Sequence, residues 1–367
     1  MTDGFTREPL IQEGASRRTA AIILAAGKST RMKTDLPKVM HDICGRPMLA
    51  YVLGACRDAG IADFHLVVGF GKDVIIEAFS KQPSVHFIEQ REQHGTGHAV
   101  SVCAEAFKGF IGDVVVIAGD MPMIRADTLR TLLSNHHRAG AAASIATTVL
   151  EDPTGYGRIV RGADGRFERI VEHRDCDVEQ LNIKEVNPSY YCFDVAALFK
   201  ALPEIKPDNA KREYYITDAL TIIRGGGQSV RAETSVPAED AVGINSRGEL
   251  AEITKLMQRR IQASWMERGV TIIAPDNTWI DSRATIGPDT VIRPFSYIEG
   301  RAKIGMRCRV GPFASVADGA VVEDGVTVGP GALNAFDATI AARGHCRSGS
   351  KREGKAVRRP PIQTGCS

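Results

Sequence analysis

Residues 21–32 read Ala-Ile-Ile-Leu-Ala-Ala-Gly-Lys-Ser-Thr-Arg-Met. The first five are small or branched and apolar on both faces, which predicts a strand buried in a parallel sheet. Gly27 follows the strand, where it lets the backbone approach a ligand and lets successive N–H groups surround phosphate oxygens. Because Gly27 is the loop's only glycine, the stretch is neither a Walker A sequence nor GxGxxG. By itself it leaves a phosphate site and an ordinary turn equally open.

Strands of the same kind recur through about residue 235 and alternate with amphipathic stretches. Apolar runs occupy 65–68 and 114–118, whereas the apolar residues of 47–59 and 127–137 recur every three or four positions. This order predicts an α/β domain with a mostly parallel sheet covered by helices on both faces. Ligands bind beyond the carboxyl ends of the strands in such sheets, so the residues that follow each strand are the candidates for a site.

Residues 246–268 carry one stripe of Leu, Ile, Met and Trp at helical spacing. Ser246 stands three residues before Glu249, which is the spacing of a capping box. We expect a linking helix within 246–270.

A strict period of six follows this helix. A helix has no such period and a single strand has a period of two, whereas coils built of short strands need one inward aliphatic residue per face. The aliphatic positions are Ile280, Ile286, Ile292, Ile298, Ile304, Val310, Val316, Val322 and Val328. Small residues or Val recur four places after each of them, from Ala284 to Ala332. We expect a short β-helix of about three coils over 271–334.

Composition and charge exclude several classes of function. The chain has 367 residues, of which 43% are hydrophobic and 25% charged, and its formal net charge of +2 indicates neither a nucleic-acid nor a membrane surface. No run approaches the roughly 20 apolar residues of a membrane span. Residues 1–18 are polar, unlike a signal peptide. The eight cysteines are scattered without CxxC or metal-ligand spacing, so we expect a reduced, cytoplasmic protein.

The tail from Arg343 is rich in Gly, Ser and Pro and carries seven basic residues against one acid. We expect residues 1–18 and 335–367 to be disordered. An RNA- or membrane-binding arm is the alternative for the tail.

Polar residues after two of the strands supply candidate chemistry. Lys28, Arg31 and Lys38 follow the first strand; Arg presents a planar fork to two phosphate oxygens and Lys a compact charge. The alternative for each is a solvated surface charge. Asp120 follows the strand at 114–118, where a carboxylate oxygen suits Mg²⁺, an ion that holds few protein ligands. The alternative is a turn-forming aspartate.

Residues 90–98 read Gln-Arg-Glu-Gln-His-Gly-Thr-Gly-His. Gln90 and Gln93 offer paired donor and acceptor groups of the kind that read a base edge. The two glycines let the backbone approach a flat ligand. His94 and His98 are four apart, but no third ligand accompanies them, so we expect no metal there.

Together these segments resemble the family of bacterial bifunctional N-acetylglucosamine-1-phosphate uridylyltransferases/glucosamine-1-phosphate acetyltransferases over about residues 20–270. The motifs occur in the family's order: Leu24–Lys38, Gln90–His98, Gly119-Asp120, Asp152–Ile159, Ile170–His173, Glu213–Asp218 and Gly243–Asn245. The resemblance implies a Rossmann-like nucleotidyltransferase domain over 19–245, followed by a left-handed parallel β-helix of hexapeptide repeats.

The implied reaction is Mg²⁺-dependent transfer of UMP from UTP to N-acetylglucosamine-1-phosphate, giving pyrophosphate and UDP-N-acetylglucosamine, a peptidoglycan precursor. The resemblance assigns nucleotide contacts to Leu24, Ala25, Ala26, Gly27 and Arg31, phosphate contacts to Lys38, and uracil contacts to Gln90, Gly95 and Thr96. It assigns Mg²⁺ to Asp120 and Asn245, and the sugar to Gly157, Glu172 and Asn187. Arg31, Lys38 and Asp120 would act in catalysis by alignment and charge neutralisation. A homotrimer through the β-helix is also implied, with a monomer as the alternative because three coils give little side area. The charge and composition already argue against a nucleic-acid or membrane partner.

The chain departs from the family's pattern at several places. Ser29 stands where the loop usually has a second glycine, and Ala118 where a larger residue is usual. Residues 187–189 read Asn-Pro-Ser where the family has Asn-Thr-Gly, which affects the expected sugar pocket. After Gly329 nothing matches the acetyltransferase half, so we expect that activity to be absent.

Two alternatives to this function stay open. One is a related nucleotidylyltransferase that uses glucose-1-phosphate with dTTP, UTP or ATP. The other is a non-catalytic regulatory subunit on the same fold, against which the retained cations and Asp120 argue.

Overall fold

The computed structural model describes residues 17–28, 30–333 and 337–341. Contacts divide the chain into a first unit that ends at Ile253 and a second that begins at Thr254. Most of the two segments expected to be disordered, namely 1–16 and 342–367, lies outside the described residues.

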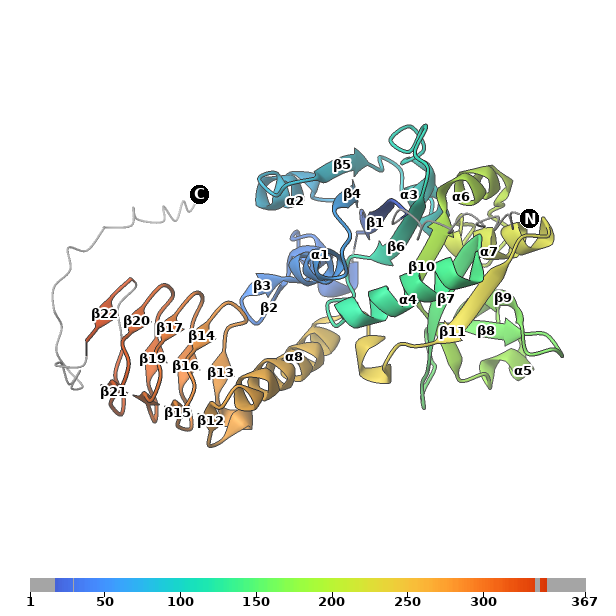
Figure 1. Cartoon of the computed structure of the whole chain (residues 1–367). Helices are drawn as coiled ribbons and strands as arrows, with labels where there is room; N and C mark the ends of the chain where they lie inside the picture. Colours follow the sequence, from blue (N-terminus) through green and yellow to red (C-terminus); the bar gives the residue numbers. More distant parts are fainter. Residues whose placement is uncertain (1–16, 29, 334–336, 342–367) are drawn as a thin grey trace, which may run out of the picture. The chain divides into compact units, whose positions relative to one another are not determined.

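The first unit is built on a nine-stranded sheet whose main path runs β11-β7-β10-β6-β1-β4-β5 (Figure 1). These strands are β1 Thr19–Ala25, β4 Asp63–Val68, β5 Val85–Glu89, β6 Asp113–Ala118, β7 Ala143–Val149, β10 Glu185–Asp194 and β11 Val230–Thr234. β10 is antiparallel to β6 and β7, whereas the other pairs on this path are parallel. The expected mostly parallel sheet is therefore confirmed.

Two hairpins complete the strands of this unit. β8 Gly157–Arg161 pairs with β9 Phe167–Val171 and, at its other edge, with β10. β2 Asp42–Ile43 and β3 Arg46–Pro47 form a separate two-stranded sheet.

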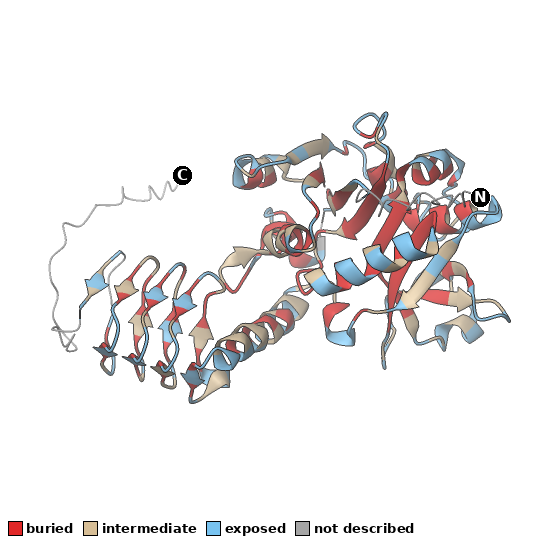
Figure 2. Ribbon diagram, in the orientation of Figure 1, coloured by how far each residue is buried: buried red, intermediate tan, exposed pale blue. Residues whose placement is uncertain are grey.

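Helices cover both faces of the sheet, which explains why its strands are apolar on both sides. Along β1, Ala20 and Ile22 belong to one apolar cluster, whereas Ala21 and Ile23 belong to another. The first cluster includes residues of α3 Thr96–Ser101, α6 Val195–Ala201 and α7 Ile216–Gly225. The second includes residues of α1 Met48–Asp58, α2 Lys72–Phe79 and α4 Ala126–Ala139. The buried central strands lie between these two layers (Figure 2).

Shorter helices fill the connections. α5 Val178–Leu181 begins with a capping box at Asp177. The 3₁₀ turns are η1 Thr30–Met32, η2 Lys38–Met40, η3 His173–Asp175, η4 Leu202–Glu204, η5 Ala238–Asp240 and η6 Pro275–Asn277. The strands expected at 21–25, 65–68 and 114–118 and the helices expected at 47–59 and 127–137 are all present, with ends that differ by one or two residues.

The expected linking helix is α8, Arg247–Glu267, and its capping box is confirmed. Glu249 N donates to Ser246 Oγ (3.2 Å), and Ser246 N donates back to Glu249 Oε2 (2.8 Å). The division between the two units falls inside this helix.

The second unit is a parallel β-helix, as the period of six predicts. Its strands are β12 Thr271–Ile272, β13 Trp279–Ile280, β14 Thr285–Ile286, β15 Val291–Ile292, β16 Tyr297–Ile298, β17 Lys303–Ile304, β18 Arg309–Val310, β19 Ser315–Val316, β20 Val321–Val322, β21 Thr327–Val328 and β22 Thr339–Ile340. They form three parallel sheets, β12-β15-β18-β21, β13-β16-β19 and β14-β17-β20-β22. β22 lies beyond the expected end at residue 334.

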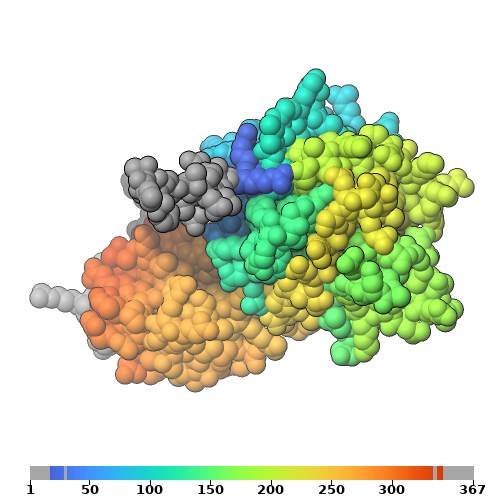
Figure 3. Space-filling model, turned by 45° about the vertical axis from the view of Figure 1, so that its right-hand side comes forward, coloured from blue at the N-terminus to red at the C-terminus, as the bar shows by residue number. Residues whose placement is uncertain are grey.

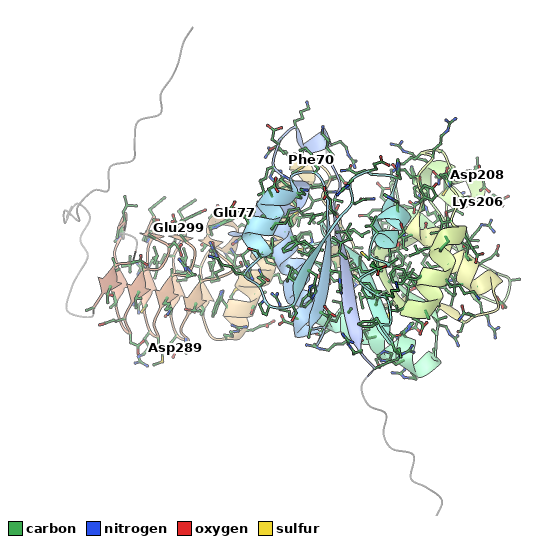
Figure 4. The ribbon with its side chains drawn as sticks, turned by 90° about the horizontal axis from the view of Figure 1, so that it is seen from above. Phe70, Glu77, Lys206, Asp208, Asp289 and Glu299 are labelled. Atoms are coloured by element: carbon green, nitrogen blue, oxygen red, sulfur yellow. The ribbon has the colours of Figure 1, made fainter. Side chains whose placement is uncertain are left out.

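Each aliphatic residue of the six-residue period points into the β-helix and is at most 5% exposed. Corner residues such as Asp289 and Glu299 point away from it on opposite sides (Figure 4). The C-terminal half of α8 closes the first coil, because Gln258 exchanges hydrogen bonds with the N–H and C=O of Ile280 (3.1 and 2.7 Å). These bonds satisfy backbone groups that would otherwise form an open edge. Among the described residues, no helix has both the length and the apolar character needed to cross a membrane.

Candidate functional site

A cleft of about 460 Å³ opens in the first unit beyond the carboxyl ends of β1 and β6. Its size falls in the range of ligand pockets, about 300–1,000 Å³. Of the residues that the sequence singles out, these line the cleft: Leu24, Arg31, Thr96, Asp120, Gly157, Glu172, Asn187 and Asn245. Gly119 N donates to Leu24 O (2.9 Å), so the ends of the two strands lie side by side.

Four polar side chains meet at this edge of the sheet. Lys38 pairs with Asp120, and its Nζ also donates to Asn245 Oδ1 (3.1 Å). Arg31 donates to the same Asn245 oxygen (2.9 Å). Ile244 N donates to Asp120 O (3.3 Å), and this bond holds the segment of Asn245 beside the end of β6. Two cations therefore face one carboxylate and one amide oxygen.

The two oxygen donors fit a magnesium ion that binds together with substrate. Asp120 and Asn245 both place an oxygen on the Lys38 ammonium, so they converge on one cation position. In the described part of the chain no group of three or more His, Cys, Asp or Glu residues forms a metal cluster. Mg²⁺ suits such a sparse oxygen site, because it retains waters and takes phosphate oxygens as its remaining ligands.

The side chain of Gln93 forms hydrogen bonds with the backbone of the glycine loop. The sequence suggests the same side chain for contacts with the edge of a base. Gln93 Nε2 donates to Ala26 O (2.7 Å), and Lys28 N donates to Gln93 Oε1 (3.3 Å). The amide therefore spans Gly27 and bonds the backbone on both sides of it. Lys28 itself lies over the ring of Phe70, with Nζ 5.4 Å from the centroid.

Gln90 is buried and bonded within its own segment. Its Nε2 contacts Gly95 O (3.2 Å) and His98 Nδ1 (3.0 Å). Gly95 has a φ of 108°, and a Cβ there would lie 2.6 Å from Tyr214 O, so only glycine fits. Thr96 Oγ1 accepts a hydrogen bond from Ile216 N (3.0 Å) at the start of α7. These contacts fix the segment that the sequence assigns to the base.

At the other end of the cleft lie the three residues assigned to the sugar. A Cβ on Gly157 would lie 3.3 Å from Glu172 Oε1, so this glycine gives the carboxylate room. Asn187 is buried; its Nδ2 donates to the Tyr191 hydroxyl (2.7 Å), and its Oδ1 accepts from Ser189 N (2.8 Å). Burial raises the pKa of Glu172, while the positive charge of Lys211 opposes that rise.

The cleft also contains residues to which the sequence assigns no role. Tyr156, Lys211, Glu213, Tyr215 and Thr217 line it, and burial together with nearby carboxylates raises the pKa of Tyr215 to about 12. Glu213, Tyr215 and Thr217 belong to the motif 213–218, so this motif is the sequence signal that could have identified them as cleft residues.

The other candidate residues are not part of the lining of the cleft. Ala25 and Ala26 are buried, and Gly27 is exposed. Lys38 contacts Asp120 and Asn245, and Gln90 contacts Gly95. Ser29, a departure from the family's loop, lies outside the described residues.

The sequence also predicts reduced cysteines and no metal at His94 and His98. None of the cysteines that the structure describes forms a disulfide, and all of these except Cys176 are buried: Cys44, Cys56, Cys103, Cys176, Cys192 and Cys308. Cys346 and Cys366 lie outside the described residues. His94 Nε2 contacts Glu92 Oε2 (2.8 Å), and His98 Nδ1 contacts Gln90 Nε2 (3.0 Å).

Over about three quarters of its length the chain is similar to known proteins. The chain is 42% identical over 280 residues to the bifunctional protein GlmU of Clostridium acetobutylicum. This alignment covers 76% of this chain and 61% of that protein. It is 46% identical over 275 residues to the bifunctional protein GlmU of Geobacter metallireducens, covering 75% of this chain and 58% of that protein. The chain thus spans about 60% of the length of these curated relatives.

A solved structure has a similar fold at low sequence identity. The crystal structure of UDP-glucose pyrophosphorylase complexed with UDP-glucose aligns with a TM-score of 0.55 and 20% identity, covering 66% of this chain and all but 1% of the other. This similarity concerns the fold alone.

Two sequence families match the two units. Residues 283–318 match six repeats of the bacterial transferase hexapeptide, in the β-helix. Residues 21–216, which contain the loop after β1 and most of the cleft, match the MobA-like NTP transferase domain. The chain therefore belongs to the MobA-like NTP transferase family, with hexapeptide repeats after its transferase domain.

Proposed function

We propose that this chain is a Mg²⁺-dependent uridylyltransferase that transfers UMP from UTP to N-acetylglucosamine-1-phosphate. The observation that carries the proposal is that Arg31, Asp120 and Asn245 line one cleft with the residues assigned to the sugar, while Lys38 bonds Asp120 and Asn245 at its edge. Membership of the NTP transferase family and similarity to the GlmU proteins support it.

The reaction needs little covalent chemistry from the protein. A phosphate oxygen of the sugar phosphate forms a bond to the α-phosphorus of UTP as the bond to the pyrophosphate oxygen breaks. The attacking oxygen is already ionised, so no general base or covalent intermediate is required. Asp120 and Asn245 would hold Mg²⁺, which when bound neutralises charge on the phosphate oxygens.

The side chains of this unit would align the two anions and offset their repulsion. Arg31 and Lys38 have their donors at the edge where phosphates would lie, and a phosphate oxygen can replace their present amide and carboxylate partners. Gln90, Gly95 and Thr96 would orient uracil, while Gly157, Glu172 and Asn187 would orient the sugar. Alignment of this kind contributes much of the rate of phosphoryl transfer.

A panel of four nucleoside triphosphates against several sugar-1-phosphates tests the proposal, with pyrophosphate release as the signal. UTP with N-acetylglucosamine-1-phosphate should be the fastest pair, and chelation of divalent metal should stop turnover. A faster reaction of dTTP, UTP or ATP with glucose-1-phosphate would establish the related specificity instead. No release with any pair would favour a non-catalytic subunit.

The related specificity has one observation in its favour. Pro188 and Ser189 line the cleft beside Asn187, where the family has Thr and Gly, and Ser189 has a φ of 67°. The side chains at the sugar end of this cleft therefore differ from the Thr and Gly that the resemblance leads us to expect there.

Two further parts of the proposal concern the β-helix. We expect no acetyl transfer from acetyl-CoA to glucosamine-1-phosphate, and acetylated product from this chain would contradict that expectation. We also expect the β-helix to assemble three chains, because it carries exposed stacked rings, with the centroids of Phe295 and Phe313 4.9 Å apart.

A further inference from the structure

Two glycine-containing turns of the first unit are each bounded by arginines. Residues 161–166 read Arg-Gly-Ala-Asp-Gly-Arg and form the tip of the β8–β9 hairpin, whereas 224–231 read Arg-Gly-Gly-Gly-Gln-Ser-Val-Arg and connect α7 to β11. The two turns line one groove of about 380 Å³. In the space-filling view the yellow segment of the second turn lies beside the green hairpin (Figure 3). We call this the arginine groove.

The arginine groove is separate from the cleft. None of the residues assigned to nucleotide, metal or sugar lines it. The same hairpin nevertheless reaches both places, because Gly157 and Glu172 at its other end line the cleft. Any test must therefore distinguish binding in the groove from binding in the cleft.

Positive charge in the groove exceeds negative charge. Arg161 is neutralised by Glu185, with which it makes two hydrogen bonds of 2.7 and 2.6 Å. Arg166 lies 3.6 Å from Asp164, and this exposed pair is weak. Arg224 and Arg231 form no ion pair and no side-chain hydrogen bond with any residue that the structure describes. Two arginines therefore present free guanidinium groups to one concavity.

The chemistry of the groove selects its ligand. Guanidinium groups bind phosphate oxygens through two parallel hydrogen bonds, and glycines in both turns let a ligand approach the backbone. The free Arg224 and Arg231 bound the second turn, and the exposed Arg166 lines the groove from the first, so an anion with charge at more than one point can meet both turns. The concave shape and the nearly neutral chain favour a compact ligand over an extended polymer such as RNA. We propose that the arginine groove binds a compact polyphosphate, meaning two or more linked phosphate groups.

Calorimetric titration of the full chain with inorganic tripolyphosphate tests this without measuring turnover, so the outcome does not depend on the proposed function. The triple variant Arg31→Gln/Lys38→Gln/Lys211→Gln removes the cations in and beside the cleft, and tripolyphosphate should still bind it at one site per chain. In that background Arg224→Gln and Arg231→Gln should each weaken binding by about tenfold, the effect of one charged hydrogen bond. Both substitutions affect exposed side chains, so thermal unfolding without ligand should be unchanged.

Arg169→Gln is the matched control, because Arg169 lies on β9 of the same hairpin, pairs with Glu168 and does not line the groove. Its affinity for tripolyphosphate should equal that of its parent. Loss of all binding in the cleft variant, or equal binding after the Arg224 and Arg231 substitutions, would overturn the proposal. Citrate or a short RNA that binds the groove more tightly than tripolyphosphate would also overturn it, in favour of a carboxylate or a nucleic-acid ligand.

Discussion

At the scale of single residues, two cations meet at one end of the cleft, whose lining also includes Glu172, Glu213 and Glu249. Arg31 and Lys38 bring two charges against the single carboxylate of Asp120, and the amide of Asn245 adds only a neutral oxygen. The Lys38 and Asp120 side chains are only 16% and 18% exposed, so water screens their interaction little. This pair of cations suits a triphosphate and a sugar phosphate, which are both anions.

Removing either partner of the Lys38–Asp120 pair should abolish most turnover. We expect Lys38→Ala and Asp120→Ala each to lower kcat for pyrophosphate release by about 10²–10³-fold, as for the loss of one group that stabilises a developing charge. Lys28→Ala is the control, because Lys28 belongs to the same loop but contacts the Phe70 ring instead of this pair, and it should lose much less. Near-wild-type release from either of the first two variants would refute the assignment.

Two glycine substitutions should have opposite effects on stability. Gly95→Ala places a Cβ 2.6 Å from Tyr214 O at a φ of 108°, so we expect it to lower the free energy of unfolding by about 1–3 kcal/mol. Gly54→Ala lies in α1 with no atom within 4 Å of the new Cβ, and it should raise that free energy by about 0.4–1 kcal/mol. Chemical denaturation measures both, and a KM for UTP that rises only in Gly95→Ala would support the role of this segment.

At the scale of elements, β6, α4 and the start of β1 meet at a buried carboxylate. Asp113, the first residue of β6, is fully buried and accepts a hydrogen bond of 2.8 Å from His137 of α4. His136 Nε2 lies 3.4 Å and Arg17 3.5 Å from it. Burial alone would raise the pKa of Asp113, but the histidines and Arg17 together hold it below its usual range.

Because this pKa is lowered in the folded chain, the free energy of unfolding should fall as the pH falls. A carboxyl group whose pKa is lower in the folded chain stabilises the fold above its unfolded pKa of about 3.9, and that contribution is lost as the pH falls through the folded value. Asp113→Asn should therefore lower the free energy of unfolding by about 1.5–3 kcal/mol at pH 7, with a difference from wild type that shrinks below about pH 4. Urea denaturation across this range measures it.

Asp127→Asn on the same helix serves as the comparison for Asp113→Asn. The Asp127 side chain is 85% exposed and pairs only with Arg130, so its loss should change stability by less than about 0.5 kcal/mol. A pH-independent loss in Asp113→Asn would show that the carboxylate's charge is not what stabilises this junction.

At the scale of the whole molecule, we expect the exposed rings of the β-helix to be the surface through which chains assemble. Phe295 and Phe313 occupy equivalent corners of successive coils and are 53% and 61% exposed. We expect Phe295→Ser/Phe313→Ser to lower the mass measured by light scattering from three chains to one. Met306→Ser lies at a different corner and is the control. A wild-type chain that is already monomeric would contradict the expected trimer.

Much of each unit could be predicted because its signals are local. The apolar runs identify β1, β4 and β6 through burial on both faces, and the period of six identifies the β-helix because each face of a coil needs one inward residue. The capping box at Ser246 depends on residues three positions apart. In each case the physical cause acts within one element or one repeat.

The candidate site could be predicted only in part. The sequence supplied the residues of the cleft through motifs, but it gave Gln93 a role in reading the base, whereas its amide bonds the backbone around Gly27. It also assigned no role to Tyr215 or Lys211, which line the cleft. The partner of a side chain depends on the path of distant segments. The donor and acceptor groups of the Gln93 amide therefore could not, from the sequence, be assigned to the backbone around Gly27.

The loop after β1 likewise combines features that the sequence determines with contacts that it does not. The sequence by itself determined a strand followed by a glycine, with cations nearby, because strand burial and glycine's freedom are local properties. Only the tertiary structure brought Lys38 onto Asp120, 82 residues away, and onto Asn245, 207 residues away. Parallel strands end at one edge whatever their separation along the chain, and the order β6-β1-β4, which the sequence does not contain, decides which ends are neighbours.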